Sequence, residues 1–300
     1  MRARSHARGG GLALYLVPGA LAFLAVIVLP FAMNVWYSFT DWQGVGSPHW
    51  TGLANYRRLW SDDQFWESFR HSLAMVLAMA VIPTALGLVV AAALFDFVAR
   101  NFGSRIASLL RACFYLPQVL PITVAGIVWS WVLAPEGGAL NALLKAVGLG
   151  SLRQDWLGDP KVALYSVMAV MVWVQLGFPV VIFMSGLQRI DPALHEAAEL
   201  DGASWWQRFW HLTLPQLRPE IYVVMLWCTI AALKVFGAVY VLTKGGPADA
   251  TDVPSYFSFA TFFEKTQVGY GSAIATVMAV IILALALVGL RFQTRAEDAQ

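Results

Sequence analysis

Residues 162–188 read VALYSVMAVMVWVQLGFPVVIFMSGLQ and contain no Asp, Glu, Lys or Arg. An α-helix needs about 20 predominantly apolar residues to cross the roughly 30 Å hydrocarbon core of a bilayer, so this stretch is long enough to span it. Five further runs have the same character: 9–40, 71–95, 112–135, 266–290 and, broken only by Lys234, 221–243. None alternates apolar and polar residues as a barrel strand does. The sequence therefore predicts an all-α polytopic membrane protein with six transmembrane helices.

The composition of the 300-residue chain also favours a membrane protein. Only 13% of its residues are charged, against about 25% in soluble domains. The two cysteines, Cys113 and Cys228, lie in apolar runs, and the five histidines are scattered along the chain. This spacing offers neither a disulfide framework nor a zinc site, so we expect no metal and no other cofactor. The net charge of +2 gives no indication of nucleic-acid binding.

The first apolar run follows MRARSHAR, which resembles the start of a signal peptide. A signal peptide has an apolar core of about 7–15 residues before a cleavage site of small residues. Here the apolar run continues from Leu12 to Val35 through two prolines. We therefore expect a retained helix rather than a cleaved leader.

The distribution of basic residues predicts the orientation. Six crossings put both termini on one side, with segments 1–10, 96–111, 188–220 and 291–300, which contain 11 Lys and Arg; the other side, with 41–70, 134–161 and 241–270, contains 8. By the positive-inside rule both termini and the 188–220 segment are predicted to be cytoplasmic. The expected organisation is a transmembrane domain over 11–291 between two cytoplasmic ends, 1–10 and 292–300.

The cytoplasmic segment 188–219 carries helix start and stop signals. Asp191 suits an N-cap, and the proline that follows it suits the first helical position. Gly202 is placed to end this helix in a left-handed conformation. Ser204 and Gln207 have the spacing of a capping box, which opens a second helix rich in Trp and Phe. The pattern predicts a helix, a tight turn and a second helix.

Two interpretations of this segment remain open. The aromatic residues of 205–210 are typical of an interfacial helix whose tryptophans lie among lipid headgroups. That interpretation does not explain 193–203, where small alanines stand beside Glu196, Glu199 and Asp201. Small residues permit close approach, and anionic lipid does not attract acidic side chains. For this half a protein partner is the better interpretation.

The same stretch resembles the EAA loop of ABC importer permeases, whose pattern is EAA-x3-G-x9-I-x-L-P. The matching residues are Glu196, Ala197, Ala198, Gly202, Leu214 and Pro215, with Leu212 in place of Ile. Other stretches resemble the carbohydrate branch of these permeases, which includes maltose, glycerol-3-phosphate and multiple-sugar systems, and are similar to the longer partner of the usual permease pair. They are GLANYRRLW (52–60), FYLPQVLP (114–121), GGALNALL (137–144), AAELDGASWWQRF (197–209), TLPQLRP (213–219), LTKGGP (242–247) and VGYGSA (268–273).

The resemblance implies a permease subunit of a bacterial inner membrane that has no catalytic residues of its own. It implies a second permease, two cytoplasmic ATPase subunits that bind the ATP, and an extracytoplasmic solute-binding protein as partners. No G-x-x-x-x-G-K-[ST] phosphate loop occurs in the chain, which agrees with ATP binding elsewhere. The EAA loop would be a coupling helix that docks on an ATPase, with Glu196 facing a basic group, Asp201 beside it and Gly202 forming the turn.

Candidates for the substrate path are fewer and weaker. Lys234 is the one charge predicted to lie deep within a transmembrane helix, where charges are costly and often functional, although it can also snorkel or bond to carbonyls. Gln118, Trp173 and Gln175 lie in or near apolar runs and can offer stacking and hydrogen bonds to a sugar, or can serve ordinary helix packing. Many relatives have Phe-Asp where this chain has Phe236-Gly237, which leaves this helix without a carboxylate for sugar hydroxyls.

Three further alternatives stay open at this point. The tryptophans of loops 41–70 and 134–161 fit either a docking face for a solute-binding protein or anchoring at the membrane surface. A self-contained secondary transporter is the main alternative function, but such carriers usually need carboxylates inside the membrane, and the predicted helices contain none. An intramembrane enzyme is disfavoured because no catalytic constellation is present. The sequence therefore favours the permease subunit of an ATP-driven sugar importer.

Overall fold

A computed structural model describes residues 9–297 of the chain. Within these residues the backbone is helical, without a named strand, and a single antiparallel bridge joins Thr40 and Trp50. The predicted all-α fold class is confirmed. The predicted terminal segments 1–10 and 292–300 extend beyond the described residues, so most of the first and the end of the second lie outside them.

The chain divides into two compact units, each of which is described by itself. The first consists of Met1–Asp62 and Ser258–Val277, and the second of Asp63–Phe257 and Met278–Gln300. The chain passes between them at three places: between Asp62 and Asp63, within α17 (Pro254–Phe259) and within α18 (Val268–Glu297). The other helices of the first unit are α1 (Gly9–Phe23), η1 (Leu24–Val28), α2 (Leu29–Tyr37), α3 (Ala54–Trp60) and η6 (Ala260–Glu264).

Two stretches that resemble the carbohydrate permeases meet inside the first unit. The side-chain amide of Asn55, from GLANYRRLW, donates to the carbonyls of Ser38 and Thr40 at 2.9 and 2.8 Å. Gly269, from VGYGSA, lies so close to the same Thr40 carbonyl that a Cβ would stand 1.9 Å from its oxygen. Both stretches therefore hold the chain where it leaves α2, which is a structural role.

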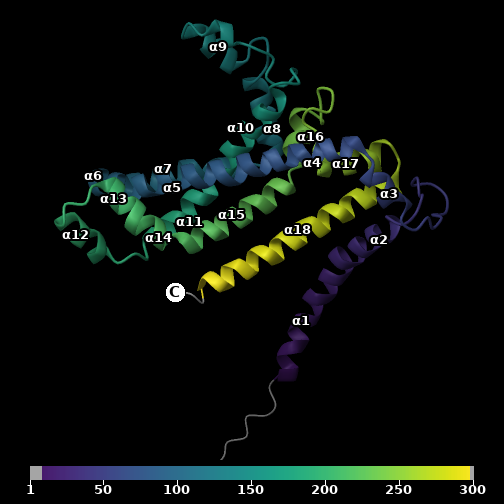
Figure 1. Ribbon diagram of the computed structural model, residues 1–300, viewed down its shortest axis with the longest axis horizontal. Helices are drawn as coiled ribbons and strands as arrows, with labels where there is room; N and C mark the ends of the chain where they lie inside the picture. The colour runs from purple at the N-terminus through teal and green to yellow at the C-terminus, as the bar shows by residue number, and fades with distance from the viewer. Residues whose placement is uncertain (1–8, 298–300) are drawn as a thin grey trace, which may run out of the picture. The chain divides into compact units, whose positions relative to one another are not determined.

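The second unit is a helical bundle that contains the candidate site (Figure 1). Its helices, in chain order, are α4 (Asp63–Val76), η2 (Leu77–Val81), α5 (Ile82–Ala92), η3 (Ala93–Val98), α6 (Ala99–Phe102), α7 (Ser104–Val119), α8 (Ile122–Val132), α9 (Ala139–Ala146), η4 (Gly150–Leu152), α10 (Ala163–Gln175), α11 (Gly177–Leu187), α12 (Pro192–Leu200), α13 (Trp205–Arg208), η5 (Phe209–Thr213), α14 (Leu214–Gln216), α15 (Arg218–Leu233) and α16 (Gly237–Leu242). The η elements are π-helical turns, except η4, which is a 3-10 turn.

Four helical stretches of the described chain are long and apolar enough to cross a membrane: Tyr15–Tyr37, Asp63–Val98, Ala163–Leu187 and Val268–Arg291. A fifth is obtained when α7 and α8 are taken together, although they bend by 97° at their junction. The bend follows from Pro121, because the residue before a proline is pushed out of the helical region, and Leu120 is extended with ψ 134°. Run 112–135 is therefore not one straight helix, and the number of six crossings remains a prediction.

The predicted helix over 221–243 is wrong in one respect. The chain leaves the helix after Leu233 and re-enters it at Gly237, so Lys234 is the C-cap of α15 and not an interior helical residue. Its backbone N–H bonds to the carbonyl of Ala231 in a tightened last turn. A discontinuous helix at membrane depth is tolerated where it is covered by protein or lines a cavity.

Close helix crossings in the second unit depend on glycine. A Cβ on Gly177, at the start of α11, would stand 2.6 Å from the Cα of Tyr115 in α7. A Cβ on Gly87 of α5 would stand 2.5 Å from the Cβ of Pro179. Close approach of backbones is how helices gain packing energy in lipid, where burial of apolar surface gives no advantage. These crossings hold the core of the unit, which includes Leu88, Val180, Phe183, Leu187 and Val224.

We expect Gly177→Leu to disrupt the second unit. The new side chain meets backbone atoms of α7, which cannot rotate away, and overpacking of this kind costs about 1–3 kcal/mol or more. The melting temperature of the detergent-purified protein should fall by several degrees and its level in the membrane should drop. Gly19→Leu is the matched control, because nothing lies within 4 Å of a Cβ there. Equal stability of the two variants would contradict the inferred packing.

Candidate functional site

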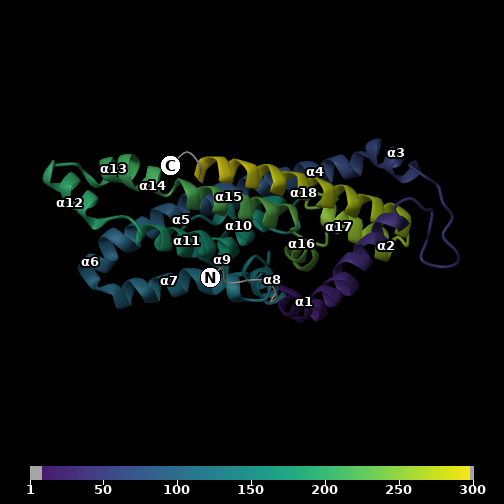
Figure 2. The same ribbon diagram turned by 90° about the horizontal axis from the view of Figure 1, so that it is seen from below.

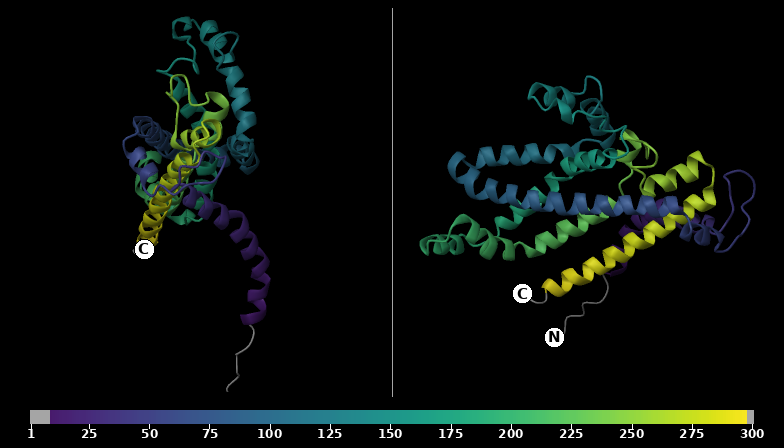
Figure 3. Two further views of the ribbon diagram at one scale, coloured as in Figure 1. Left: turned by 90° about the vertical axis from the view of Figure 1, so that its right-hand side faces the viewer. Right: turned by 45° about the horizontal axis from the view of Figure 1, so that its top comes forward.

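The segment from α12 to α14 lies at one end of the second unit. Figures 1 and 2 both show α12 and α13 at the same end as α6, away from α8 and α16. The right-hand view of Figure 3 shows the same green segment projecting beyond the ends of the longer helices. The structure thus brings residues from 96–111 and 188–220 to one end, as expected for two segments on the same side of a membrane.

The predicted helix signals of this segment are confirmed atom by atom. The Asp191 carboxylate accepts the backbone N–H of Ala193 at 2.9 Å and caps α12. The capping box of α13 is complete, because the N–H of Ser204 donates to Gln207 Oε1 at 2.7 Å and the N–H of Gln207 to Ser204 Oγ at 3.4 Å. Local hydrogen bonding therefore determines where both helices begin.

The turn between the two helices depends on Gly202. Its φ is +79°, in the left-handed region that residues with a Cβ avoid. Its N–H donates to the carbonyl of Glu199 at 3.1 Å, and the N–H of Ala203 donates to that of Ala198 at 3.0 Å. This is the C-terminal helix motif that the sequence predicts, and it reverses the chain between α12 and α13.

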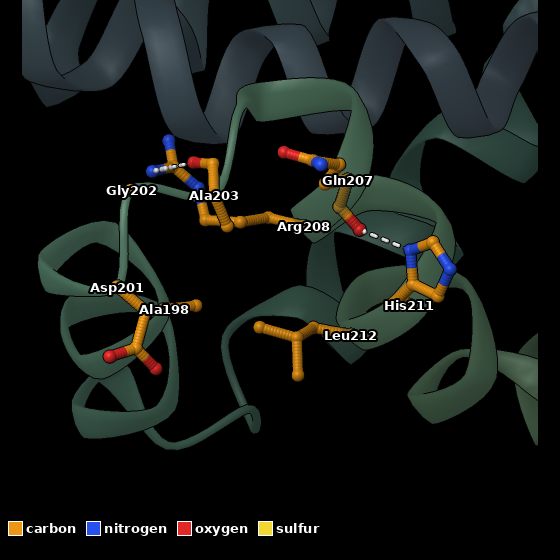
Figure 4. A pocket seen from close by; sticks show the side chains of 8 residues that line it. All are labelled: Ala198, Asp201, Gly202, Ala203, Gln207, Arg208, His211 and Leu212. Atoms are coloured by element: carbon orange, nitrogen blue, oxygen red, sulfur yellow. Dashed lines mark hydrogen bonds between the residues drawn. The ribbon is translucent and has the colours of Figure 1, made fainter.

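A hollow of about 420 Å³ lies between α12 and the aromatic half of the segment (Figure 4). Figure 4 shows the Arg208 side chain lying across this hollow toward the turn. Its guanidinium donates to the Ala203 carbonyl at 3.2 Å and stands 3.6 Å from the Glu199 carboxylate. The lining residues are Ala198, Asp201, Gly202, Ala203, Gln207, Arg208, His211 and Leu212.

The residues of the EAA-like pattern divide into two groups. Glu196, Ala197 and Asp201 are exposed, and Ala198 is half-buried, so α12 presents a small, acidic surface to the outside. Leu214 and Pro215 are half-buried in α14, where the segment returns to α15. Only Ala198, Asp201 and Gly202 of the predicted coupling residues line the hollow.

Two ion pairs at this site were not foreseen from the sequence. Arg208 pairs with Glu199 across the turn. Arg189, just before the segment, forms an ion pair with the carboxylate of Glu220, just after it. The two ends of the segment therefore lie close together. Glu220 is buried although it is an acid close to an apolar run. That a charge stands at each end of the segment is visible in the sequence, but their contact depends on how α11 and α15 pack.

The predicted substrate-path residues lie in α7, in α10 and at the end of α15. Gln175 is buried at the end of α10 and donates to Cys228 Sγ at 3.3 Å. Trp173 packs edge-to-face on Trp129, with ring centroids 5.4 Å apart. Gln118 is half-buried near the end of α7, and Lys234 is exposed at the break after α15. No described hydrogen bond or ring contact joins any two of the four predicted side chains.

Gly237 has a packing role that the sequence did not indicate. A Cβ at this position would stand 2.7 Å from Cγ2 of Ile122, where α16 crosses α8. A neighbouring crossing is equally close, because a Cβ on Gly126 would stand 2.7 Å from Val241. The absence of a Cβ at Gly237 therefore permits this close crossing of α16 and α8.

Comparison with known proteins gives a consistent result. A family model described as "Binding-protein-dependent transport system inner membrane component" matches residues 84–298. The chain is 37% identical over 281 residues to the "Probable ABC transporter permease protein YurN" of Bacillus subtilis (strain 168), covering 93% of this chain and 94% of that protein. It is 32% identical over 279 residues to the "Trehalose/maltose transport system permease protein MalF" of Thermococcus litoralis, covering 93% and 92%.

A solved structure has the same fold. One chain of a bacterial ABC transporter involved in the import of the acidic polysaccharide alginate matches with a TM-score of 0.82, over 95% of both chains. The two sequences are 22% identical, so this likeness concerns the fold alone.

Proposed function

Because the chain belongs to the family of binding-protein-dependent transport system inner membrane components, we propose that it carries a sugar or sugar derivative and is driven through its 191–215 segment. Membership of the family makes the chain the permease subunit of an ABC importer and a multi-pass protein of the inner membrane. In this family ATP hydrolysis is performed by separate ATPase subunits. The sugar assignment is supported by the names of relatives, which include a trehalose/maltose transport system permease protein.

The coupling role rests chiefly on the exposure of α12. This helix projects at one end of the unit with the acidic and small residues of the EAA-like pattern uncovered, whereas the second half of the segment is packed inward. An exposed carboxylate between alanines suits a tight contact with a basic group of a partner. Closure of two ATPase subunits would displace α12, and the attached helices would move with it.

The assembly that follows from this proposal has four kinds of protein component. The chain pairs with a second permease, two ATPase subunits bind on the cytoplasmic side, and a solute-binding protein delivers the sugar from outside. Both termini are then cytoplasmic, and lipid surrounds the outer helices. Substrate passes along the interface between the two permeases, where discontinuous helices such as α15 and α16 are typical of transport sites.

We expect Lys234→Met to lower transport without affecting assembly. Lys234 is exposed at the helix break, where its ammonium can donate to sugar oxygens, and a hydrogen bond to a charged group is worth about 1.5–3 kcal/mol. The maximal uptake rate should therefore fall roughly tenfold, while copurification of the ATPase stays normal. Lys234→Arg should restore part of the rate. Unchanged uptake by Lys234→Met would show that Lys234 does not contribute to the substrate path.

The proposal is tested by purifying the tagged chain from its native membrane in mild detergent. Recovery of an ATPase and a second permease is expected, and the reconstituted complex should import at least one of a panel of radiolabelled mono- and disaccharides, including maltose and trehalose, only with MgATP. Recovery of the chain alone, together with uptake driven by a proton or sodium gradient, would instead favour a self-contained secondary transporter.

A further inference from the structure

The two halves of the 191–215 segment differ in how deeply their side chains are buried. In α12 Leu200 is 90% exposed, and Glu196 and Ala197 are also exposed. In the second half Phe209 is 4% exposed and Thr213 is 1% exposed. Apart from the buried His195, α12 is therefore largely available to a partner, whereas one face of the second half packs into the body of the second unit and Trp206 and Trp210 stay exposed.

The buried half is inserted among helices from distant parts of the chain. Phe209 belongs to the apolar core that also contains Leu94 of η3, Leu187 of α11 and Leu217. The ring of Trp205 stacks on Phe209 at 5.3 Å and packs against the same core. These contacts place α13 against the end of the span Asp63–Val98, to which it is not connected in sequence.

One polar bond joins α13 to that span. The indole N–H of Trp205 donates to the carboxylate of Asp96 at 3.1 Å, across 109 positions of sequence. Asp96 lies in the π-helical turn η3 and is the only charged residue in 71–98. A hydrogen bond to a carboxylate is stronger and more directional than one between neutral groups. It ties α13 to the span at a defined point.

The exposed half is linked to the buried half by Arg208. The Arg208 guanidinium contacts the Ala203 carbonyl and Glu199, so it spans the turn from α13 back to the end of α12. A displacement of α12 therefore reaches α13 through the turn and Arg208. From α13 the Trp205–Asp96 bond leads on to the span Asp63–Val98.

We propose that Asp96 and Trp205 are positioning residues that transmit the movement of α12 to the span Asp63–Val98. This inference rests on the proposed coupling function of the 191–215 segment. Without the bond, α12 still moves α15, which follows it along the chain. With the bond, the displacement is also delivered to the span directly at Asp96, in addition to the packing of α15 and α11 on the same span.

The test uses two reporters in the complete importer, with Cys113 replaced by Ser. One carries Leu86→Cys on the span Asp63–Val98 and the other carries Tyr222→Cys on α15; both positions are exposed in this chain. Each cysteine is labelled with a nitroxide, and its mobility is compared before and after trapping with MgATP and vanadate. Trp205→Phe removes the donor and keeps the stacked ring, whereas Asp96→Leu removes the acceptor.

We expect the parent protein to respond at both reporters. In Trp205→Phe and in Asp96→Leu the response at position 86 should be reduced several-fold while that at 222 persists, because apolar packing on the span remains. The double variant should be no worse than either single one, because the bond is broken once. Asp96→Asn, which keeps an acceptor oxygen, should retain most of the response. Trp206→Phe makes the same change on an exposed neighbouring ring and should behave as the parent.

Three outcomes would overturn the inference or its premise. A normal response at position 86 in both variants would refute the link. Loss at both reporters in both variants, with a lowered melting temperature, would show that the pair only stabilises the fold. If neither nitroxide changes its mobility in the parent on trapping with MgATP and vanadate, although ATPase subunits copurify with it, the coupling function itself would be refuted rather than the Asp96 link.

Discussion

Replacement of Gly202 by proline is expected to abolish sugar uptake while the protein still inserts and purifies normally. The residue has a φ of +79°, whereas proline is restricted to about −65°. Proline also removes the N–H that donates to the Glu199 carbonyl. A misplaced proline costs about 3 kcal/mol, which reduces the population of the native turn roughly 100-fold. The helix α12 would then no longer be presented in its native direction.

A graded series at the same position separates backbone strain from steric conflict. Nothing lies within 4 Å of a Cβ on Gly202, so the cost of alanine is conformational only, about 1–2 kcal/mol. Asparagine tolerates the left-handed region better than alanine. Uptake should therefore decrease in the order Gly, Asn, Ala, Pro, at equal expression. Full uptake by the proline variant would show that the turn is not needed for coupling.

Reversal of charge at Glu196 is expected to remove the ATPase from the complex. Its carboxylate is exposed on α12, where the proposed partner offers a basic group. Loss of one partner of a charged interfacial pair costs about 2–5 kcal/mol, and a reversed charge adds repulsion. Glu196→Lys should thus lower recovery of the ATPase in a pull-down at least about tenfold and stop uptake, whereas Glu196→Gln should be intermediate.

Two controls sharpen this prediction. Glu136→Lys makes the same charge change on an exposed residue in the loop 134–161, which is predicted to lie on the opposite side of the membrane. It should leave recovery of the ATPase unchanged. High salt should weaken the parent complex in the same direction as Glu196→Gln, because screening reduces interactions between exposed charges. Equal recovery with Glu196→Lys and with the parent would place the contact elsewhere.

The helix ends of the 191–215 segment were predictable because their causes are local. Asp191, Gly202, Ser204 and Gln207 act on backbone groups within three residues of themselves, so the sequence alone specifies the caps and the turn. The membrane class was predictable for a similar reason, since the length of an uncharged run directly reflects the thickness of a bilayer. Pro121 is visible in the sequence, but the 97° size of the bend beside it is not.

Other features depend on which helices pack together. The run 221–243 is interrupted only by Lys234 and predicts one helix, yet the helix ends there and α16 packs on α8 instead. Gln175 is buried against Cys228 of α15, a contact that the sequence does not indicate. The partners of Arg189, Arg208 and Trp205 likewise could not be identified from spacing. Each of these contacts either joins residues far apart in the sequence or depends on the side-chain rotamer that the residue adopts.

By itself the sequence determined the membrane class, the all-α fold and the local geometry of the caps and the turn in the 191–215 segment. Its apolar runs, caps and turn glycine act over a few residues, and their energies do not depend on distant parts of the chain. The tertiary structure alone decided where the membrane helices bend or break and how the segment is anchored to the bundle. The Asp96–Trp205 bond shows the reason, because two residues far apart in sequence meet only when packing has brought η3 and α13 together.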